Sequence, residues 1–143
     1  MSAEQGSHHE LTEFAFERKP QHIKFVEKVA VTEGVVCDVY FFVGDETKDL
    51  GIITIQPGCS TPRQLVLGGS RTIEGYISGR GELIIDSSNG EKEFYPVDDS
   101  YPGRFQVDVN VGDVMQWLAE KDSSLVVYEI CFPPYKDGRY QDL

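Results

Sequence analysis

Residues 73–85 read IEGYISGRGELII, and this stretch decides the fold. Two runs rich in β-branched and aromatic residues flank Gly79-Arg80-Gly81, so the stretch predicts a strand, a tight glycine turn and a second strand. The same pattern continues along the chain, where turn residues return about every 8–12 positions and short apolar runs lie between them. This spacing predicts an all-β sandwich or barrel.

The remaining strands are expected between these turns. The predicted strands span residues 21–30, 34–43, 49–56, 71–78, 81–86, 91–96, 104–110, 113–118 and 124–132. Asn89-Gly90 predicts a hairpin between two of them, because both residues accept positive φ. No long helix is expected, and Leu11 to Arg18 forms at most one short helical turn because Pro20 ends it.

Length and composition favour one domain. The chain has 143 residues, of which 40% are hydrophobic, which suits a single core. We expect residues 1–15 to be a mobile N-terminal tail and residues 16–143 to form one barrel domain. No apolar run approaches the ~20 residues of a membrane helix. The three cysteines are odd in number and widely spaced, which indicates no disulfide framework and a reducing, cytoplasmic location.

The charge of the chain limits its partners. There are 24 acidic and 13 basic side chains, giving a formal net charge of -11. Such a surface repels a phosphate backbone and an anionic membrane. We therefore expect neither nucleic acid nor membrane as a partner.

Residues 74–81 resemble the end of the first conserved motif of the cupin family. In that motif a glutamate is followed by six residues and a glycine, the relation in which Glu74 and Gly81 stand. Pro57-Gly58 is similar to the turn before the family's ligand strand, and Gly112-Asp113 is similar to the start of its second motif. The resemblance covers about residues 50–135. It implies a cupin-type double-stranded β-helix, that is, a jelly-roll barrel.

The chain departs from the family pattern at the metal ligands. The family places two histidines before the glutamate and a third in the second motif, yet residues 63–72 and 117–124 contain no histidine. A transition-metal site needs three or four converging ligands. We therefore expect no metal and no other cofactor, and a metal-dependent oxygenase or decarboxylase ranks third among the possible functions.

Glu74 is the first candidate for chemistry. If strand 71–78 faces the cavity as it does in the family, Thr72, Glu74 and Tyr76 point inward together. Burial raises the pKa of a carboxyl group toward that of a general acid or base. Glu74 and Tyr76 are therefore the expected catalytic residues. The structural alternative is a Glu74 bonded to Tyr76, Arg63 or Arg71.

Other side chains are expected to bind the ligand. The planar fork of Arg63 suits a carboxylate or phosphate, although a surface arginine is the alternative reading. Trp117 belongs either to the core or to a stacking wall. Tyr128 and Glu129 lie on opposite faces of one strand, so only one of them can line the cavity. The expected ligand-binding residues are Arg63, Gln64, Thr72, Met115, Trp117 and Tyr128.

Two classes of function remain open. The first is a metal-independent cupin barrel that binds a small polar organic molecule and, if it is an enzyme, transfers protons as an isomerase, epimerase, dehydratase or cyclase. The alternative is a non-catalytic binding or assembly module with a degenerate barrel. An open, polar-lined cavity favours the first, and a barrel filled by Leu, Met and Trp favours the second.

A homodimer is expected on two grounds. An aromatic tail follows Pro133-Pro134 and needs surface to pack on, and the run from His22 to Val26 can add to a sheet edge.

Overall fold

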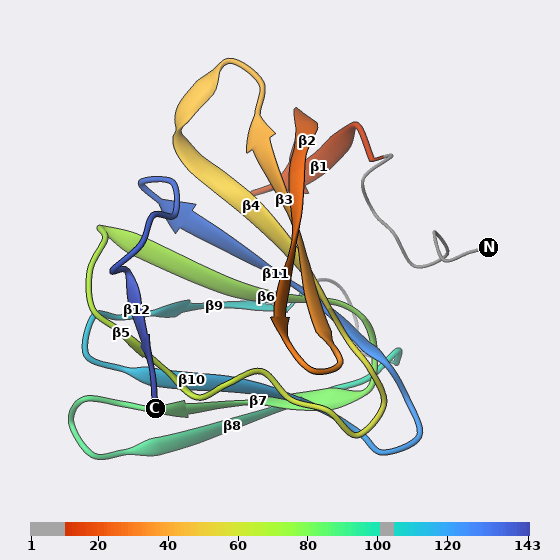
Figure 1. The fold of residues 1–143 in the computed structure, drawn as a ribbon, viewed down its shortest axis with the longest axis vertical. Coiled ribbons are helices and arrows are strands. Elements are labelled where there is room, and N and C mark those ends of the chain that lie inside the picture. The colour runs from red at the N-terminus through yellow and green to blue at the C-terminus, as the bar shows by residue number, and fades with distance from the viewer. Residues whose placement is uncertain (1–10, 101–104) are drawn as a thin grey trace.

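The structure, a computed structural model, describes residues 11–100 and 105–143, which form two antiparallel sheets (Figure 1). The large sheet has the order β1-β2-β3-β4-β11-β6-β9, and the small sheet has the order β12-β5-β10-β7-β8. The strands are β1 (Glu13–Phe16), β2 (Lys19–Thr32), β3 (Val35–Phe42), β4 (Asp45–Ile55), β5 (Gln64–Val66), β6 (Arg71–Gly79), β7 (Gly81–Asp86), β8 (Lys92–Val97), β9 (Gln106–Val109), β10 (Val114–Ala119), β11 (Leu125–Phe132) and β12 (Tyr140–Asp142). The predicted all-β class is confirmed, and the described part of the chain contains no helix that could cross a membrane.

Every predicted strand is present: β7 has the predicted bounds and the others are shifted at one or both ends, while residue 104 of the predicted strand 104–110 lies outside the described part of the chain. The largest shift is in β4, which begins at Asp45 rather than at residue 49. The predicted hairpin joins β7 to β8, with Asp86 opposite Lys92. Both Asn89 and Gly90 were expected to have positive φ, but in the turn Gly90 has positive φ (93°) and Asn89 does not. The side-chain oxygen of Asn89 instead accepts a hydrogen bond from the Glu91 N–H at 3.0 Å.

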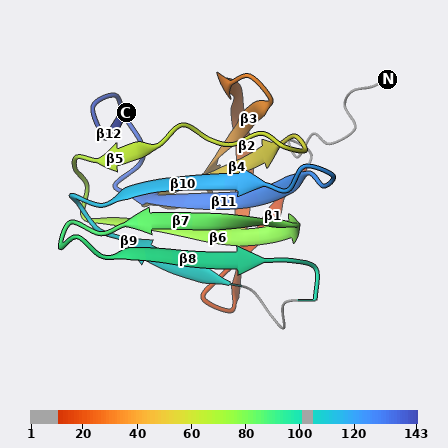
Figure 2. The same ribbon diagram turned by 90° about the horizontal axis from the view of Figure 1, so that it is seen from below.

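The two sheets lie face to face, with β10, β7 and β8 over β11, β6 and β9 (Figure 2). Buried apolar side chains from both sheets fill the space between them, and we call this group the inner core. Its members include Tyr76, Leu83, Met115, Trp117 and Leu125. Burial of such side chains is the main favourable term in folding. The middle of the barrel is therefore filled.

A second apolar cluster, the outer core, covers the opposite face of the large sheet. It contains Phe14, Phe16, Ile23, Tyr40, Phe42, Leu50, Ile52, Ile73, Tyr128 and Ile130. The hairpin of β1 and β2 supplies part of it, and the ring of Phe14 meets that of Tyr128 edge to face at 5.0 Å. The central strands of the large sheet are thus buried on both faces.

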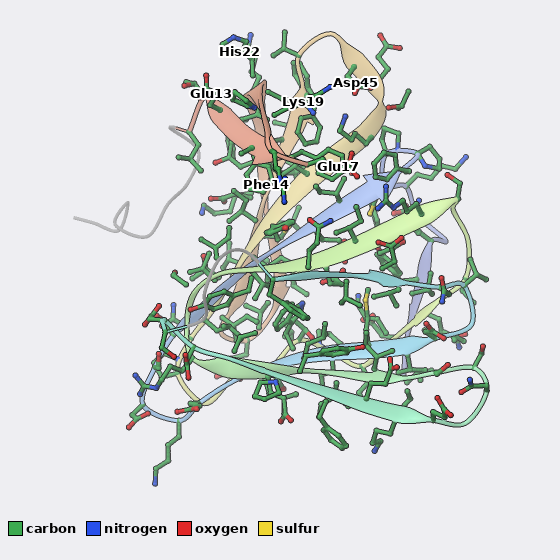
Figure 3. The ribbon with its side chains drawn as sticks, turned by 180° about the vertical axis from the view of Figure 1, so that it is seen from behind. Glu13, Phe14, Glu17, Lys19, His22 and Asp45 are labelled. Atoms are coloured by element: carbon green, nitrogen blue, oxygen red, sulfur yellow. The ribbon has the colours of Figure 1, made fainter. Side chains whose placement is uncertain are left out.

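The N-terminal hairpin replaces the expected helical turn. Glu17 and Arg18 have φ of 52° and 69°, as a two-residue turn between antiparallel strands requires. Burial alternates along β1, which is the period of a strand. A strand thus begins at Glu13, inside the predicted tail, whereas residues 1–10 lie outside the described part of the chain. In Figure 3 the hairpin residues Glu13, Phe14, Glu17, Lys19 and His22 lie at one end of the molecule, together with Asp45.

The C-terminal segment is tied back onto the barrel by Arg139. This side chain is buried and donates hydrogen bonds to the carbonyl oxygens of Pro133 (3.0 Å) and Arg71 (2.7 Å), and to the Thr72 hydroxyl (3.0 Å). The anchored segment continues as β12, which pairs with β5, and neither of these short strands was predicted. This arrangement places Tyr140 against the interior of the barrel.

Candidate active site

Two glutamates face each other across neighbouring strands on the inner face of the large sheet. Glu74 of β6 lies directly opposite Glu129 of β11, and Glu129 in turn lies opposite Gly51 of β4. Side chains opposite each other on antiparallel strands have Cβ atoms about 4.5–5.5 Å apart, where like charges repel. Gly51 has no side chain, and a Cβ added there would lie only 2.9 Å from Sγ of Cys37, so the Cys37 side chain takes up the space beside it.

Glu74 is buried, with 1% of its surface exposed. Its Oε1 accepts a hydrogen bond from the indole N–H of Trp117 at 2.8 Å, while no described group donates to its Oε2. Burial first, and then the charge of Glu129, hold the pKa of Glu74 well above its usual value. A proton on Oε2 would satisfy that atom and remove the repulsion between the two carboxylates. Both effects favour the protonated form of Glu74.

A chain of donors reaches Glu129 from the C-terminal segment. The thiol of Cys131 lies 3.6 Å from Oε1 of Glu129 and 3.2 Å from the hydroxyl of Tyr140. Burial, followed by the charge of Glu129, raises the pKa of both Cys131 and Tyr140. Both groups thus stay protonated and act as donors rather than nucleophiles.

Glu129 lines a cavity of about 380 Å³ between the large sheet and the β5–β12 edge. This size is in the usual range for a small-molecule pocket. Glu74 lies behind Glu129 and does not line it. The lining residues are Glu27, Val29, Ala30, Val31, Cys37, Val39, Asp49, Leu50, Gly51, Ile53, Thr61, Gln64, Glu129, Cys131, Tyr135, Tyr140 and Asp142.

Asp49 is a second titratable carboxyl group in this cavity. Its Oδ2 accepts a hydrogen bond from the backbone N–H of Tyr135 at 3.0 Å. Burial is the main reason that the pKa of Asp49 rises to about 6, and the charge of Glu129 adds to it. The cavity therefore contains a carboxyl group that titrates close to physiological pH.

The structure brings three of the predicted site residues to this region. Glu74 and Trp117 form the hydrogen bond described above, and Gln64 lines the cavity. Met115 lies in the inner core, and Thr72 is held by Arg139. The predicted structural partners of Glu74 are not used: Arg63 pairs with Asp86 and Arg71 with Asp108.

Two further predicted site residues, Tyr76 and Arg63, lie away from the cavity. The hydroxyl of Tyr76 is within hydrogen-bonding distance of Gly79 O (2.8 Å) and Asp99 Oδ1 (3.0 Å), at the far end of β6. Burial and the bond to Asp99 raise the pKa of Tyr76 to about 12, which does not suit a base. The side chain of Arg63 is half exposed on the surface.

The placement of Tyr128 requires a correction. Its ring lies in the outer core, on the face of β11 opposite to the cavity, so it is Glu129 that faces the ligand space. Sequence reasoning missed Glu129, Asp49, Cys131 and Tyr140. The only available signal was the alternation along β11, which allows either Tyr128 or Glu129 to face inward.

The residues around Glu74 do not fit a metal site. Within residues 11–100 and 105–143, no three His, Cys, Asp or Glu side chains are grouped so that they could hold an ion. Trp117 contacts the carboxyl group, and an indole N–H is a donor and not a metal ligand.

Comparison with solved structures identifies the fold. The structure superposes on a cupin-2 domain protein, Rru_A2000 from Rhodospirillum rubrum, with a TM-score of 0.59 at 15% sequence identity, covering 86% of this chain and 75% of that one. The chain has the cupin fold. This confirms the resemblance drawn from Glu74 and Gly81 and the predicted jelly-roll barrel.

Two further cupin-fold neighbours are larger proteins. CapF from Staphylococcus aureus, a capsular polysaccharide assembling protein, matches with a TM-score of 0.63 at 15% identity over 83% of this chain and 34% of CapF. Oxalate decarboxylase from Bacillus subtilis matches with a TM-score of 0.65 at 19% identity over 82% of this chain and 30% of that one. This chain thus spans about a third of their length. No protein-family model and no curated protein matches the sequence. The cupin fold hosts many activities, so these likenesses concern the fold alone.

Proposed function

We propose that this cupin binds a small organic molecule in the cavity beside Glu129 and transfers protons to and from it. The observation that carries the proposal is the pair formed by the buried Glu74 and the half-buried Glu129 at the edge of an open cavity, with Oε2 of Glu74 lacking a described donor. Perturbed carboxyl groups beside a cavity are typical of general acid–base sites. An isomerase, epimerase, dehydratase or cyclase would use such a pair.

The two carboxyl groups have different roles in this proposal. One proton shared between Glu74 and Glu129 leaves the pair with a single negative charge. Glu129, which contacts the ligand, accepts a proton from it, and the pair becomes neutral. The same pair returns a proton to another atom of the ligand, which closes the cycle without any other reactant. Trp117 fixes the orientation of Glu74 throughout.

Deuterium exchange tests this chemistry before a substrate is known. The protein is incubated with a cell-extract metabolite mixture in D₂O, and mass spectrometry follows deuterium entering carbon positions of each metabolite. We expect one or a few metabolites to gain deuterium with wild type and with the exposed-site control Glu91→Gln, but not with Glu74→Gln or Glu129→Gln. Equal incorporation with all four proteins, or none with wild type, would contradict proton transfer.

Metal independence is part of the proposal. Its support is that the described residues around Glu74 include no group of three His, Cys, Asp or Glu side chains that could hold an ion. Elemental analysis of the purified protein, freed of any affinity tag, tests it. Stoichiometric iron, zinc, nickel or manganese would show that the proposal is wrong.

The alternative, an assembly module, is favoured by two observations. The inner core fills the middle of the barrel, and among the described strands only β3 pairs with β2 beyond Ile23. Strand β1 already covers the edge at His22, so the open edge lies further along than predicted. It exposes Val26 (52%) and Val29 (38%), and exposed edges tend to pair.

We propose that a second copy of the chain pairs with this edge. The open segment, residues 24–32, carries two lysines and one glutamate, so it is slightly basic. Two copies that meet at this segment therefore avoid the repulsion between the acidic surfaces of the chain. Sedimentation at micromolar concentration should give twice 16.1 kDa, and Val29→Asp should give a monomer. A wild-type monomer would refute the dimer.

A cytoplasmic location is also proposed, supported by free thiols at Cys37, Cys59 and Cys131. Cell fractionation with an antibody to the native protein tests it, and recovery outside the cytoplasmic fraction would contradict it.

A further inference from the structure

The charged residues that line the cavity are all acidic. They are Glu27, Asp49, Glu129 and Asp142, and no Lys, Arg or His belongs to the lining. None of the four forms an ion pair with another described residue, in contrast to Asp38, which pairs with Lys28 at 2.8 Å. Asp49 accepts a hydrogen bond only from a neutral backbone N–H, and Asp142 accepts one from the Gln64 amide at 3.2 Å.

Arg139 is a buried cation close enough to lower the pKa of Asp49, but it does not line the cavity and forms no ion pair with these carboxyl groups. The guanidinium of Arg139 is committed to Pro133, Arg71 and Thr72, behind the wall formed by Tyr140. The cavity therefore has an acidic potential that a ligand must match, because charge interactions strengthen away from bulk water.

A buried polar atom behind the cavity adds a second, independent observation. Glu74 has 1% of its surface exposed, and its Oε2 has no described donor on the side where Glu129 faces it. A buried acceptor without a donor costs free energy. A proton on Glu74 satisfies Oε2 and leaves the negative charge of the pair on Glu129, for which a bound cation would supply the positive partner that no described residue gives it.

The remaining walls are apolar and aromatic. Val31, Val39 and Ile53 provide apolar surface, and the rings of Tyr135 and Tyr140, with centroids 5.8 Å apart, lie at the C-terminal side. Aromatic faces attract cations as well as apolar groups. A ligand with an apolar body and a positively charged group fits such a cavity.

We propose that the ligand is an organic cation, a protonated amine or guanidinium on an apolar body, with its charge between Glu129 and Asp49. The inference rests on the proposed function, because it concerns the same cavity and the same carboxyl pair. It also means that phosphates and carboxylates are rejected, contrary to the anion clamp expected at Arg63, which lies on the surface.

Three matched probes test the charge of the ligand: phenethylamine, 2-phenylethanol and phenylacetate, which share one apolar body. Binding to the wild-type chain is measured by NMR titration of backbone amides in β4 and β11 at pH 7. We expect phenethylamine to bind at least about tenfold more tightly than the alcohol, and phenylacetate not to bind. The near-isosteric changes Asp49→Asn and Glu129→Gln should remove this preference, while Asp86→Asn, a surface control, should keep it.

The outcomes separate the two proposals. If the alcohol or phenylacetate binds in the cavity as tightly as the amine, the cation inference is overturned while ligand binding in the cavity stands. If Asp86→Asn weakens amine binding as much as Asp49→Asn does, the amine binds to the acidic surface and the inference is also overturned. If no probe shifts the cavity amides, the inference fails, and deuterium exchange decides the proposed function independently.

Discussion

Replacing Glu74 by glutamine tests the protonation state on which the site depends. A protonated glutamic acid and a glutamine have nearly the same shape. The glutamine oxygen would accept the Trp117 N–H, and its NH₂ would donate to Glu129, where Oε2 of Glu74 now has no donor. The substitution should therefore leave stability unchanged at acidic pH.

The expected effect grows as the pH rises. The folded-state pKa of Glu74 is raised above its ordinary 4.5, so the native state binds more protons than the unfolded chain above about pH 4.5. Glu74 therefore contributes most to the free energy of unfolding below pH 4.5, and this contribution is lost as the pH rises toward the folded-state pKa. Between pH 4.5 and the folded-state pKa, the free energy of unfolding falls by about 1.4 kcal/mol per pH unit. Glutamine does not titrate, so Glu74→Gln removes this pH dependence. The variant should be more stable than wild type at pH 8 by at least about 1.4 kcal/mol.

Urea unfolding at pH 5 and pH 8 measures this difference, with Glu91→Gln as the exposed control. Glu74→Leu should be less stable than wild type by about 1–3 kcal/mol at pH 5, because the buried Trp117 N–H loses its acceptor. The reasoning is refuted if Glu74→Gln shows the same difference from wild type at both pH values, or if it is less stable than wild type at pH 8. Either result would mean that Glu74 is a carboxylate with a partner of its own.

Three further substitutions test the supporting contacts. Trp117→Phe should lower the free energy of unfolding by about 1–3 kcal/mol, because Glu74 loses its only described donor, as urea unfolding at pH 5 would show. Arg139→Met should cost about 2–3 kcal/mol and speed amide exchange in residues 140–142, and unchanged exchange would show that the C-terminal segment does not need this anchor. Gly75→Ala should cost about 1–3 kcal/mol in thermal unfolding, because the new Cβ would lie 2.1 Å from Cζ of Tyr128; a neutral result would show that the ring moves freely.

The main strands could be predicted from the sequence because their signals are local. Alternation and turn residues within residues 73–85 are enough to fix β6 and β7. The strands β5 and β12 have three residues each and form by pairing with segments far away in the sequence, β12 with β5 and β5 also with β10. No window of sequence contains that pairing, so the cavity wall that includes Tyr140 was not foreseen.

The site itself was half predicted. Glu74 was found through a family motif and through alternation on β6, and both point to the interior. Glu129 was missed because β11 is apolar on both faces, so its sequence does not show which face meets the cavity. The answer depends on the outer core, which exists only once the N-terminal hairpin has docked against Tyr128.

Because its central strands are buried on both faces, the large sheet resists a one-residue slip in register for a different reason than a sheet with one solvent-exposed face. In a sheet with one wet face, a slip of one residue moves apolar side chains into water, and the loss of burial opposes it. Here a slip of β11 would exchange its residues between two apolar cores. The penalty would come from Glu129, whose carboxyl group would enter the cluster around Phe14 and Ile73, where nothing charged can be hydrated. Glu129 thus also favours the correct register of β11, and a chain with an apolar residue in its place would lose this protection against a misaligned strand.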